Sequence, residues 1–292
     1  MAASDTLLFN IPDWITTNEP SFVPPVCNKL MHGAGQLKIM FIGGPNVRKD
    51  YHMEEGEELF YQIRGDMVLK IVEKGQHKDI VIKEGEMFQL PSRIPHSPQR
   101  QANTVGLVVE RERYEHETDG LRYYQEGSTD ILWEKWFYCY DLGKQLGPVI
   151  GEYFASEEHK TGQPPAGRVF TDPPIKLDVS TEVTAPMTLN TYLSNMKHNT
   201  TSSIFGKGEL RVEAVKGAKY GPSTTPAGLE AFIWVLEGSC KATVKTTAGT
   251  VEVDNLKKQD SLLVTEKCEF WLDEGSEDLI ALIITMDPKA NK

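Results

Sequence analysis

Short apolar segments separated by turn residues dominate the first half of the chain. From Leu37 to about Glu112 they are rich in Val, Ile, Phe and Tyr and are broken by Gly, Pro and charged residues, as in LKIMFIGG, ELFYQIRG, MVLKIVEKG, DIVIKEG, EMFQLP and VGLVVERER. Runs of this kind are typical of β-strands, and many short strands favour an antiparallel sandwich or barrel. The first half is therefore predicted to be a β-module.

The pattern changes between about Thr129 and His159, in TDILWEKWFYCYDLGKQLGPVIGEYFASEEH. Apolar residues recur there at helical spacing, interrupted by a Gly-Pro step. The Pro-rich stretch GQPPAGRVFTDPPIKL that follows is typical of an irregular connector. We therefore predict helices between two β-modules, followed by a linker.

The later half repeats the pattern of the first. ELFYQIRGDMVLKIV is echoed by EAFIWVLEGSCKATV, and EMFQLPSRIPHS is echoed by DSLLVTEKCEFW. Two β-barrels of common ancestry explain such an echo. The predicted division is residues 1–160 for the first module with its helices, 161–185 for the linker and 186–292 for the second module.

Composition and charge narrow the class of protein. Of the 292 residues, 39% are hydrophobic and 25% are charged, as in soluble globular proteins. A formal net charge of -11 disfavours a general nucleic-acid binder. The opening MAASDTLLFNIPDWI lacks the pattern of a signal peptide, and no later run approaches the length of a membrane span. We expect a cytosolic protein without nucleic-acid or membrane partners.

The four cysteines are far apart and form no CxxC pair. Neither a disulfide framework nor a structural zinc site is visible in their spacing. Free thiols are the expectation.

Two polar motifs stand out within the first module. His52 lies six residues before Glu58 in GPNVRKDYHMEEGEELFYQIRG, and His96 follows in GEMFQLPSRIPHSPQR. Together they resemble the two signature motifs of the cupin superfamily, in which a small β-barrel gathers metal ligands from two facing hairpins. Glu54 stands where many cupins have a second histidine, and Arg93 stands where they have a glycine. The resemblance therefore implies three protein ligands, not four.

Two histidines and one carboxylate leave open positions on a metal. This arrangement lets Fe(II) bind a substrate and dioxygen together. Zinc also accepts such ligands, so the ligand types alone do not decide the metal. In the second module, Thr225, Ala231 and Phe270 fall near the positions of the three ligands. Only the first module is predicted to carry metal.

Other residues of metal-binding type have simpler explanations. Single histidines are usually surface or hydrogen-bonded residues. An acidic run next to a turn is usually solvated, or it supports a nearby site. The first description is expected for His32, His77, His116, His159 and His198, and the second for Glu54, Glu55 and Glu57.

A narrower resemblance rests on PPVCNKLMH, on LKIMFIGGPNVRKDYHMEEGEELFYQIRGDMVLKIVEKG, on HSPQRQANTVGLVVERERYE and on DGLRYYQ. These segments resemble the 3-hydroxyanthranilate 3,4-dioxygenase family, most densely over about residues 23 to 143. The resemblance implies a mostly β fold with two cupin-type β-barrels, joined by a helical and Pro-rich connector. It also implies Fe(II) on His52, Glu58 and His96.

The resemblance implies roles for further residues. Arg100 would bind the substrate carboxylate through two parallel hydrogen bonds, a geometry that suits a guanidinium. Glu110 would hydrogen-bond the substrate hydroxyl or amine and accept the phenolic proton. Arg48 would face the dioxygen pocket, where negative charge develops. Asn28 would lie on a loop over the pocket. Without the resemblance, Glu110 begins a solvated ERER edge and Arg48 is an exposed turn residue.

The implied reaction inserts both atoms of O2 into the ring of 3-hydroxyanthranilate. Its product, 2-amino-3-carboxymuconate semialdehyde, is the precursor of quinolinate in NAD biosynthesis from tryptophan. Bacterial members carry an additional rubredoxin-like iron on two CxxC pairs, which this chain lacks. The chain resembles the longer animal-type form, which implies a monomer with one iron.

Two other function classes remain open. A zinc or manganese cupin, such as a sugar-phosphate isomerase, would use the same ligands as a Lewis acid. It would need several cations for phosphate, and the motifs offer mainly Arg48 and Arg100. A bicupin that only binds a ligand or partner would leave the three metal ligands without a use.

Overall fold

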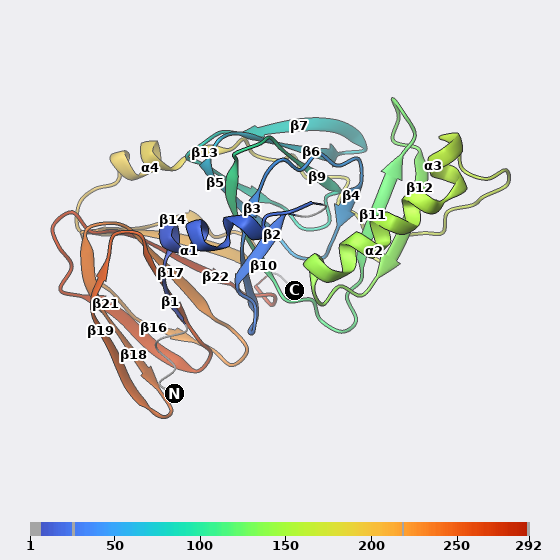
Figure 1. Cartoon of the computed structure of the whole chain (residues 1–292). Coiled ribbons are helices and arrows are strands. Elements are labelled where there is room, and N and C mark those ends of the chain that lie inside the picture. The colour runs from blue at the N-terminus through green and yellow to red at the C-terminus, as the bar shows by residue number, and fades with distance from the viewer. Residues whose placement is uncertain (1–6, 25–26, 218, 291–292) are drawn as a thin grey trace.

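The computed structural model describes residues 7–24, 27–217 and 219–290 (Figure 1). Within these residues, antiparallel strands form four sheets, two in each half of the chain. The first six residues, part of the opening segment searched for a signal peptide, lie outside the described residues.

We number the sheets 1 to 4. Sheet 1 contains, in spatial order, β12 (Ile131–Phe137), β11 (Asp119–Tyr124), β4 (Tyr51–Met53), β9 (His96–Arg100), β6 (Met67–Glu73) and β7 (Gln76–Ile82). Sheet 2 contains β13 (Met187–Thr188), β8 (Glu86–Leu90), β5 (Glu58–Arg64), β10 (Val105–Arg111), β3 (Leu37–Gly43) and β2 (Asn28–His32). These two sheets form the first module.

The second module consists of sheets 3 and 4. Sheet 3 contains β1 (Leu8–Asn10), β20 (Asp260–Val264), β17 (Ala231–Glu237), β22 (Ile280–Met286), β15 (Leu210–Lys216) and β14 (Thr200–Phe205). Sheet 4 contains β16 (Tyr220–Thr225), β21 (Cys268–Asp273), β18 (Ser239–Thr246) and β19 (Gly249–Lys257). Among the described residues, none of the four sheets closes on itself.

The alternation of side chains along each strand explains how the sheets pack. In β3, Ile39 and Phe41 join the core between sheets 2 and 3, whereas Met40 and Ile42 join the core between sheets 1 and 2. Successive residues of a strand point to opposite faces, so such a strand must be apolar throughout. The modules therefore pack back to back, with sheets 2 and 3 buried on both faces.

Helices lie between and beside the sheets. They are α1 (Ile11–Asn18), α2 (Leu142–Ala155), α3 (Glu157–Thr161) and α4 (Leu189–Asn195), with a 3-10 turn η1 (Glu19–Ser21). The side chain of Asp141 caps α2 by accepting a hydrogen bond from the backbone N–H of Lys144. The apolar side of α2 packs against β11 and β12 in a lobe at the end of the molecule (Figure 1).

Helix was predicted over residues 129–159, and the first part of that prediction is wrong. Residues 131–137 form strand β12, which pairs with β11 through Tyr123↔Trp133 and Leu121↔Lys135. The segment ILWEKWF is rich in aromatic and β-branched residues, which favour a strand when a partner edge is available. Helices α2 and α3 confirm the later part.

The Pro-rich connector is irregular, as predicted, and residues 162–186 contain neither helix nor strand. It runs along the first module, where Val183 packs in the core and its backbone N–H donates to Glu73. Each half also lends a short strand to the other half. Strand β1 pairs with β20 in sheet 3, and β13 pairs with β8 in sheet 2.

The predicted repeat appears in the pairing of strands. Glu58 pairs with Leu90 between β5 and β8, as Ala231 pairs with Val264 between β17 and β20. His96 pairs with Ile71, and Phe270 correspondingly pairs with Val244. Ala231 and Phe270 are therefore the counterparts of Glu58 and His96.

The third counterpart differs from the prediction by two residues. His52 pairs with His96, and the residue paired with Phe270 is Ser223, not Thr225. Seven residues, 224–230, separate Ser223 from Ala231, whereas five residues, 53–57, separate His52 from Glu58, and this difference shifts the alignment by two. Neither residue is a histidine or carboxylate, so the second module still lacks the ligand set.

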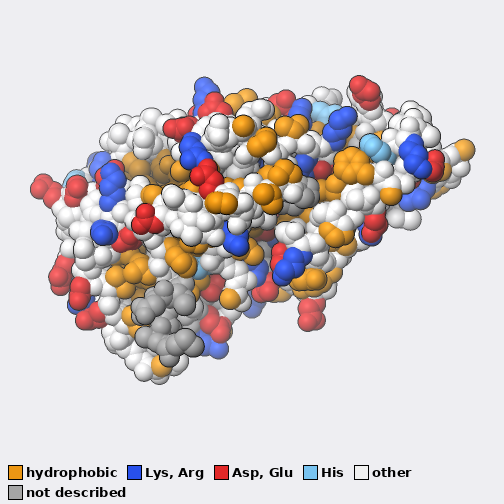
Figure 2. All heavy atoms as spheres, in the orientation of Figure 1, with side chains coloured by type: hydrophobic (Ala, Val, Ile, Leu, Met, Phe, Trp, Pro, Cys, Tyr) orange, Lys and Arg blue, Asp and Glu red, His pale blue; other side chains and the backbone are white. Residues whose placement is uncertain are grey.

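No helix in the described part of the chain is long and apolar enough to cross a membrane. On the face shown in Figure 2, acidic and basic side chains are mixed and do not gather by sign. All four cysteines are buried and free, as predicted.

Candidate metal centre

The two motif histidines lie side by side in sheet 1. His52 on β4 and His96 on β9 are directly paired, and their ring centroids are 5.2 Å apart. Glu58 is the first residue of β5 in the facing sheet 2. It points inward because it shares a face of the strand with Phe60, which packs in the core between the sheets. Two hairpins from facing sheets thus converge.

The three side chains fit a metal ion. Each is buried and offers one ligand atom, and these atoms lie within 4.8 Å of one another. Within the described residues, Glu58 Oε1 is buried without a hydrogen bond, although His96 Nε2 lies 2.9 Å from it. Two nitrogens and a free carboxylate oxygen are donors that a divalent transition metal accepts.

Charge within the site favours ionisation of Glu58. Burial raises the pKa of this carboxyl, but the positive charge of the neighbouring His96 lowers the pKa by more, so that it lies below the ordinary value for a glutamate. Burial lowers the pKa of His96, but Glu58 raises it more. The carboxylate is therefore kept in the form that binds a cation.

The three candidate ligands face a cavity between the sheets that encloses about 470 Å³, its open mouth included. Its polar wall is formed by the three ligands and by Asn28, Asn46, Arg48, Arg100 and Glu110, and its apolar wall by Met40, Ile42, Phe60, Pro98, Val108, Leu142 and Leu146. A second hollow shares Asn28, Met40, Glu110 and Leu142 with it. This hollow is bordered by Cys139–Gly143, ahead of and at the start of α2, and leads to the surface.

Arg100 ends β9, with its guanidinium in the cavity wall. The residue is only 1% exposed, and its Nε and Nη2 have no hydrogen-bond partner among the described residues. Burial and the neighbouring Arg48 lower the pKa of Arg100 to about 10, so the group is still charged at neutral pH. An unpaired buried cation is costly unless an anion completes it.

Arg48 also lies in the cavity wall, but it is paired. Its guanidinium holds both oxygens of Asp50, and Gln99 hydrogen-bonds its backbone N–H and C=O. The pKa of Arg48 is raised because Asp50 outweighs the effect of burial. The interpretation of Arg48 as an exposed turn residue is therefore wrong.

Glu110 lies on β10 on the same face as Val108 and is 4% exposed. The alternative in which it begins a solvated edge is wrong, because Arg111 and Arg113 are buried as well and only Glu112 of that segment is exposed. Burial raises the pKa of Glu110 above its ordinary value, and Arg113 opposes this shift.

The remaining polar predictions have different outcomes. Glu54 is buried and contacts Arg113 at 2.6 Å, so it supports the site and is not solvated. Asn28 lines both hollows but begins strand β2, so the prediction of a loop is wrong. Arg93 has φ of 62°, which explains why related motifs use glycine, since a side chain in this region costs about 1–2 kcal/mol.

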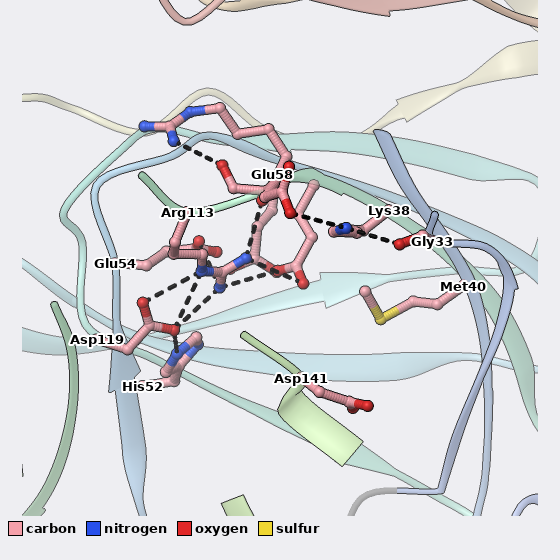
Figure 3. A network of polar contacts seen from close by, with 12 residues as sticks. Gly33, Lys38, Met40, His52, Glu54, Glu58, Arg113, Asp119 and Asp141 are labelled. Carbon is pink, nitrogen blue, oxygen red and sulfur yellow. Dashed lines mark hydrogen bonds and ion pairs between the residues drawn. The ribbon is translucent and has the colours of Figure 1, made fainter. Parts of the chain in front are cut away.

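Two residues beside the candidate ligands were not predicted from the sequence. Arg113 and Asp119 lie in RERYEHETDG, a segment with the composition of a solvated turn. Both are buried, and Asp119 contacts His52 (Figure 3). Charge pairs between distant segments leave no periodic signal in a sequence.

Comparisons with known proteins identify a matching family. A family model described as 3-hydroxyanthranilic acid dioxygenase matches residues 3–154. A relative from Nematostella vectensis, named 3-hydroxyanthranilate 3,4-dioxygenase, is 52% identical over 286 residues, which is 96% of this chain and 99% of the relative. The Homo sapiens protein of the same name is 47% identical over 288 residues, 96% of each chain.

Solved structures support the fold. A cupin 2 conserved barrel domain protein from Leptotrichia buccalis has a TM-score of 0.52 at 12% identity and covers 96% of each chain. An oxalate decarboxylase has a TM-score of 0.52 at 17% identity, covering 99% of this chain and 78% of its own. At such identities these matches show the cupin fold and no more. Through its family match and its full-length relatives, the chain belongs to the 3-hydroxyanthranilic acid dioxygenase family.

Proposed function

We propose that this protein is an Fe(II)-dependent dioxygenase that converts 3-hydroxyanthranilate and O2 to 2-amino-3-carboxymuconate semialdehyde, the precursor of quinolinate in NAD biosynthesis from tryptophan. His52, Glu58 and His96 hold the iron. Both oxygen atoms enter the product as the ring bond beside the hydroxyl-bearing carbon breaks. Ferrous iron in this site would supply open coordination positions and the electrons that activate dioxygen.

The unpaired guanidinium of Arg100 is the observation that carries this proposal. It is buried in the wall of the cavity that contains the metal ligands, with two nitrogens unpartnered among the described residues. A substrate carboxylate would satisfy both through parallel charge-assisted hydrogen bonds. Arg100 thereby anchors one side of the ring and turns the hydroxyl and amine toward the ligands.

Glu110 receives the phenolic proton in this proposal. It lies in the same cavity wall, and burial makes it a stronger base than an ordinary glutamate. Transfer of the proton to Glu110 gives the substrate oxygen the negative charge that suits a metal ligand. The apolar side chains of the cavity exclude water from this step.

Arg48 provides a fixed positive charge near the same space. Because Asp50 holds its guanidinium, the charge is already oriented before dioxygen enters. A group fixed in this way stabilises negative charge that develops on oxygen without needing to rearrange.

The cations of the cavity argue against a sugar-phosphate isomerase. Arg48 already donates to both oxygens of Asp50, which leaves Arg100 as the cation with open donors among the described residues of this wall. One open guanidinium matches a carboxylate, whereas a phosphate dianion needs more positive charge.

The proposal includes a monomer in the cytosol. The second module covers the outer face of sheet 2 through a shared core, the face by which a single-module form would associate. Light scattering should give a mass near 32.8 kDa. A mass near twice that value would contradict this part of the proposal.

The test is anaerobic loading with Fe(II), addition of 3-hydroxyanthranilate and exposure to oxygen, while product absorbance and oxygen uptake are followed. One O2 consumed per substrate is expected. His52→Ala should abolish turnover. The control is His77→Ala, which should leave turnover unchanged because His77 lies away from the cavity. Bound iron without oxygen uptake would contradict the proposal.

A further inference from the structure

Asp119 at the start of β11 is hydrogen-bonded to one of the two ligand histidines. His52 Nε2 lies 2.7 Å from Asp119 Oδ2, and both side chains are almost fully buried. Strand β11 is paired with β4 along Leu121↔His52, so this contact joins neighbouring strands of one sheet. With Nε2 bonded to the carboxylate, Nδ1 is the nitrogen of His52 left for a metal.

In His96 the other ring nitrogen, Nδ1, makes the hydrogen bond. Its Nδ1 lies 3.1 Å from the backbone oxygen of Ile94, which fixes the proton on Nδ1. Its Nε2 lies on the side of Glu58, at 2.9 Å from Oε1. Because a carboxylate and a carbonyl oxygen can only accept, the two hydrogen bonds leave a different nitrogen without a proton on each ring, Nδ1 on His52 and Nε2 on His96.

Arg113 joins Asp119 to the other acidic residues of the site (Figure 3). Its Nε and Nη2 donate to Asp119 at 3.1 Å and 3.0 Å. Its Nη1 lies 3.1 Å from Glu110, and its Nη2 lies 2.6 Å from Glu54. One buried guanidinium therefore contacts three buried carboxylates. A lysine, with its single charged nitrogen, could not span them.

We propose that Asp119 and Arg113 are positioning residues for the metal centre and for Glu110. Asp119 fixes the tautomer and ring orientation of His52 so that Nδ1 binds the metal. Arg113 holds Asp119 and Glu110 at a set separation, so that the metal ligand and the proton acceptor keep their places relative to each other. The inference rests on the proposed function, because it takes His52 as a ligand.

A merely structural role predicts loss of stability and nothing else. The chain offers a matched control in the ion pair of Arg122 and Glu134, at 2.8 Å, which also joins β11 to a neighbouring strand and is similarly buried. It does not contact the ligands. Glu134→Gln thus removes a buried charge from β12, the strand next to β11, without changing Asp119, Arg113 or their contacts.

The test uses the full metal-free chain and zinc as a diamagnetic probe, with chelator competition for affinity. Asp119→Asn should bind zinc roughly 10–100-fold more weakly, as expected for a residue that orients a ligand. Glu134→Gln should keep wild-type affinity. Equal affinity in all three proteins would overturn the inference, and failure of the wild type to bind zinc would overturn the metal site with it.

A second measurement needs no variant. In zinc-loaded protein labelled with 15N-histidine, long-range proton–nitrogen spectra should show one ligand histidine bound through Nδ1 and the other through Nε2. Two histidines bound through the same nitrogen would overturn the inference. This readout holds even if Asp119→Asn fails to fold.

Discussion

Single residues in this protein owe their properties to burial more than to their chemical type. Arg64 and Arg100 are the last residues of strands β5 and β9. Arg64 pairs with Glu19 at the surface, whereas Arg100 is buried, with two guanidinium nitrogens that lack a partner among the described residues. An exposed ion pair contributes little to stability, whereas a buried cation without a partner favours binding of an anion. The same side chain therefore serves different purposes.

Arg100→Lys should raise the KM for 3-hydroxyanthranilate by roughly 10–100-fold, because one of two charge-assisted hydrogen bonds is lost. Steady-state oxygen uptake measures this change. The control is 2-aminophenol, which lacks the carboxylate and should be turned over equally poorly by both proteins. If both substrates lost the same factor, Arg100 would not be the carboxylate anchor.

His32 lies at the junction of the two modules between Phe9 and Phe232, and among the described residues its Nε2 has no partner. Burial lowers the pKa of His32 from 6.5 to about 4. Between about pH 4 and pH 6.5, His32 is therefore protonated in the unfolded chain but neutral in the folded protein. The resulting stability is fully present above about pH 6.5 and is lost as the pH falls toward 4.

His32→Leu should thus unfold less readily on acidification than the wild type. The difference in unfolding free energy between pH 7 and pH 4 should shrink by about 3 kcal/mol at most, measured by urea denaturation. His116→Leu removes an exposed histidine and is the control. An unchanged pH dependence in His32→Leu would contradict the assignment.

Strands β5 and β10 carry Glu58 and Glu110. A residue adjacent to each of them is hydrogen-bonded to the second module. Glu57 accepts hydrogen bonds from the backbone N–H of Leu210 and from Gln89. Arg111 bonds Glu209 as well as both oxygens of Glu117. The second module therefore fixes the strands that place the carboxylates of the site.

Arg111→Met should lower the free energy of unfolding by about 3–5 kcal/mol, because it removes a buried guanidinium that donates to both oxygens of the buried Glu117. Chemical denaturation measures this loss. Arg64→Met, at an exposed pair, should cost at most about 1 kcal/mol. Similar losses at the two positions would show that the buried contact with the second module contributes no more than a surface pair.

The two modules share one core. Residues of sheet 2, such as Phe41 and Leu107, pack with Phe232 and Ile284 of sheet 3, and each module lends a strand to the other. The division into residues 1–160, 161–185 and 186–292 stays a prediction. Such a continuous interface should make the two modules unfold together.

Loss of bound zinc and loss of far-ultraviolet circular dichroism should therefore follow one transition in denaturant. Phe232→Ala, in the second module, should shift both curves together and cost about 3–5 kcal/mol. Two separate transitions, with metal loss unaffected by Phe232→Ala, would show that the modules are independent.

The sequence by itself determined the elements whose signal is local. Alternating apolar runs indicated the strands, the echo between the halves indicated the repeat, and the spacing of His52, Glu58 and His96 indicated a candidate set of metal ligands. These signals survive in sequence because strand faces follow a period of two and because ligands from two hairpins need a fixed spacing.

Only the tertiary structure decided what depends on distant partners. Residues 131–137 form a strand because β11 offers an edge. Arg113 is buried because three carboxylates surround it, and Asp119 is buried because it is paired with Arg113 and His52. The counterpart of His52 is Ser223 and not Thr225, because the segment that leads from it to β17 is two residues longer than the segment from His52 to β5. Burial of a charge depends on the sum of contacts from several segments, and no local pattern records that sum.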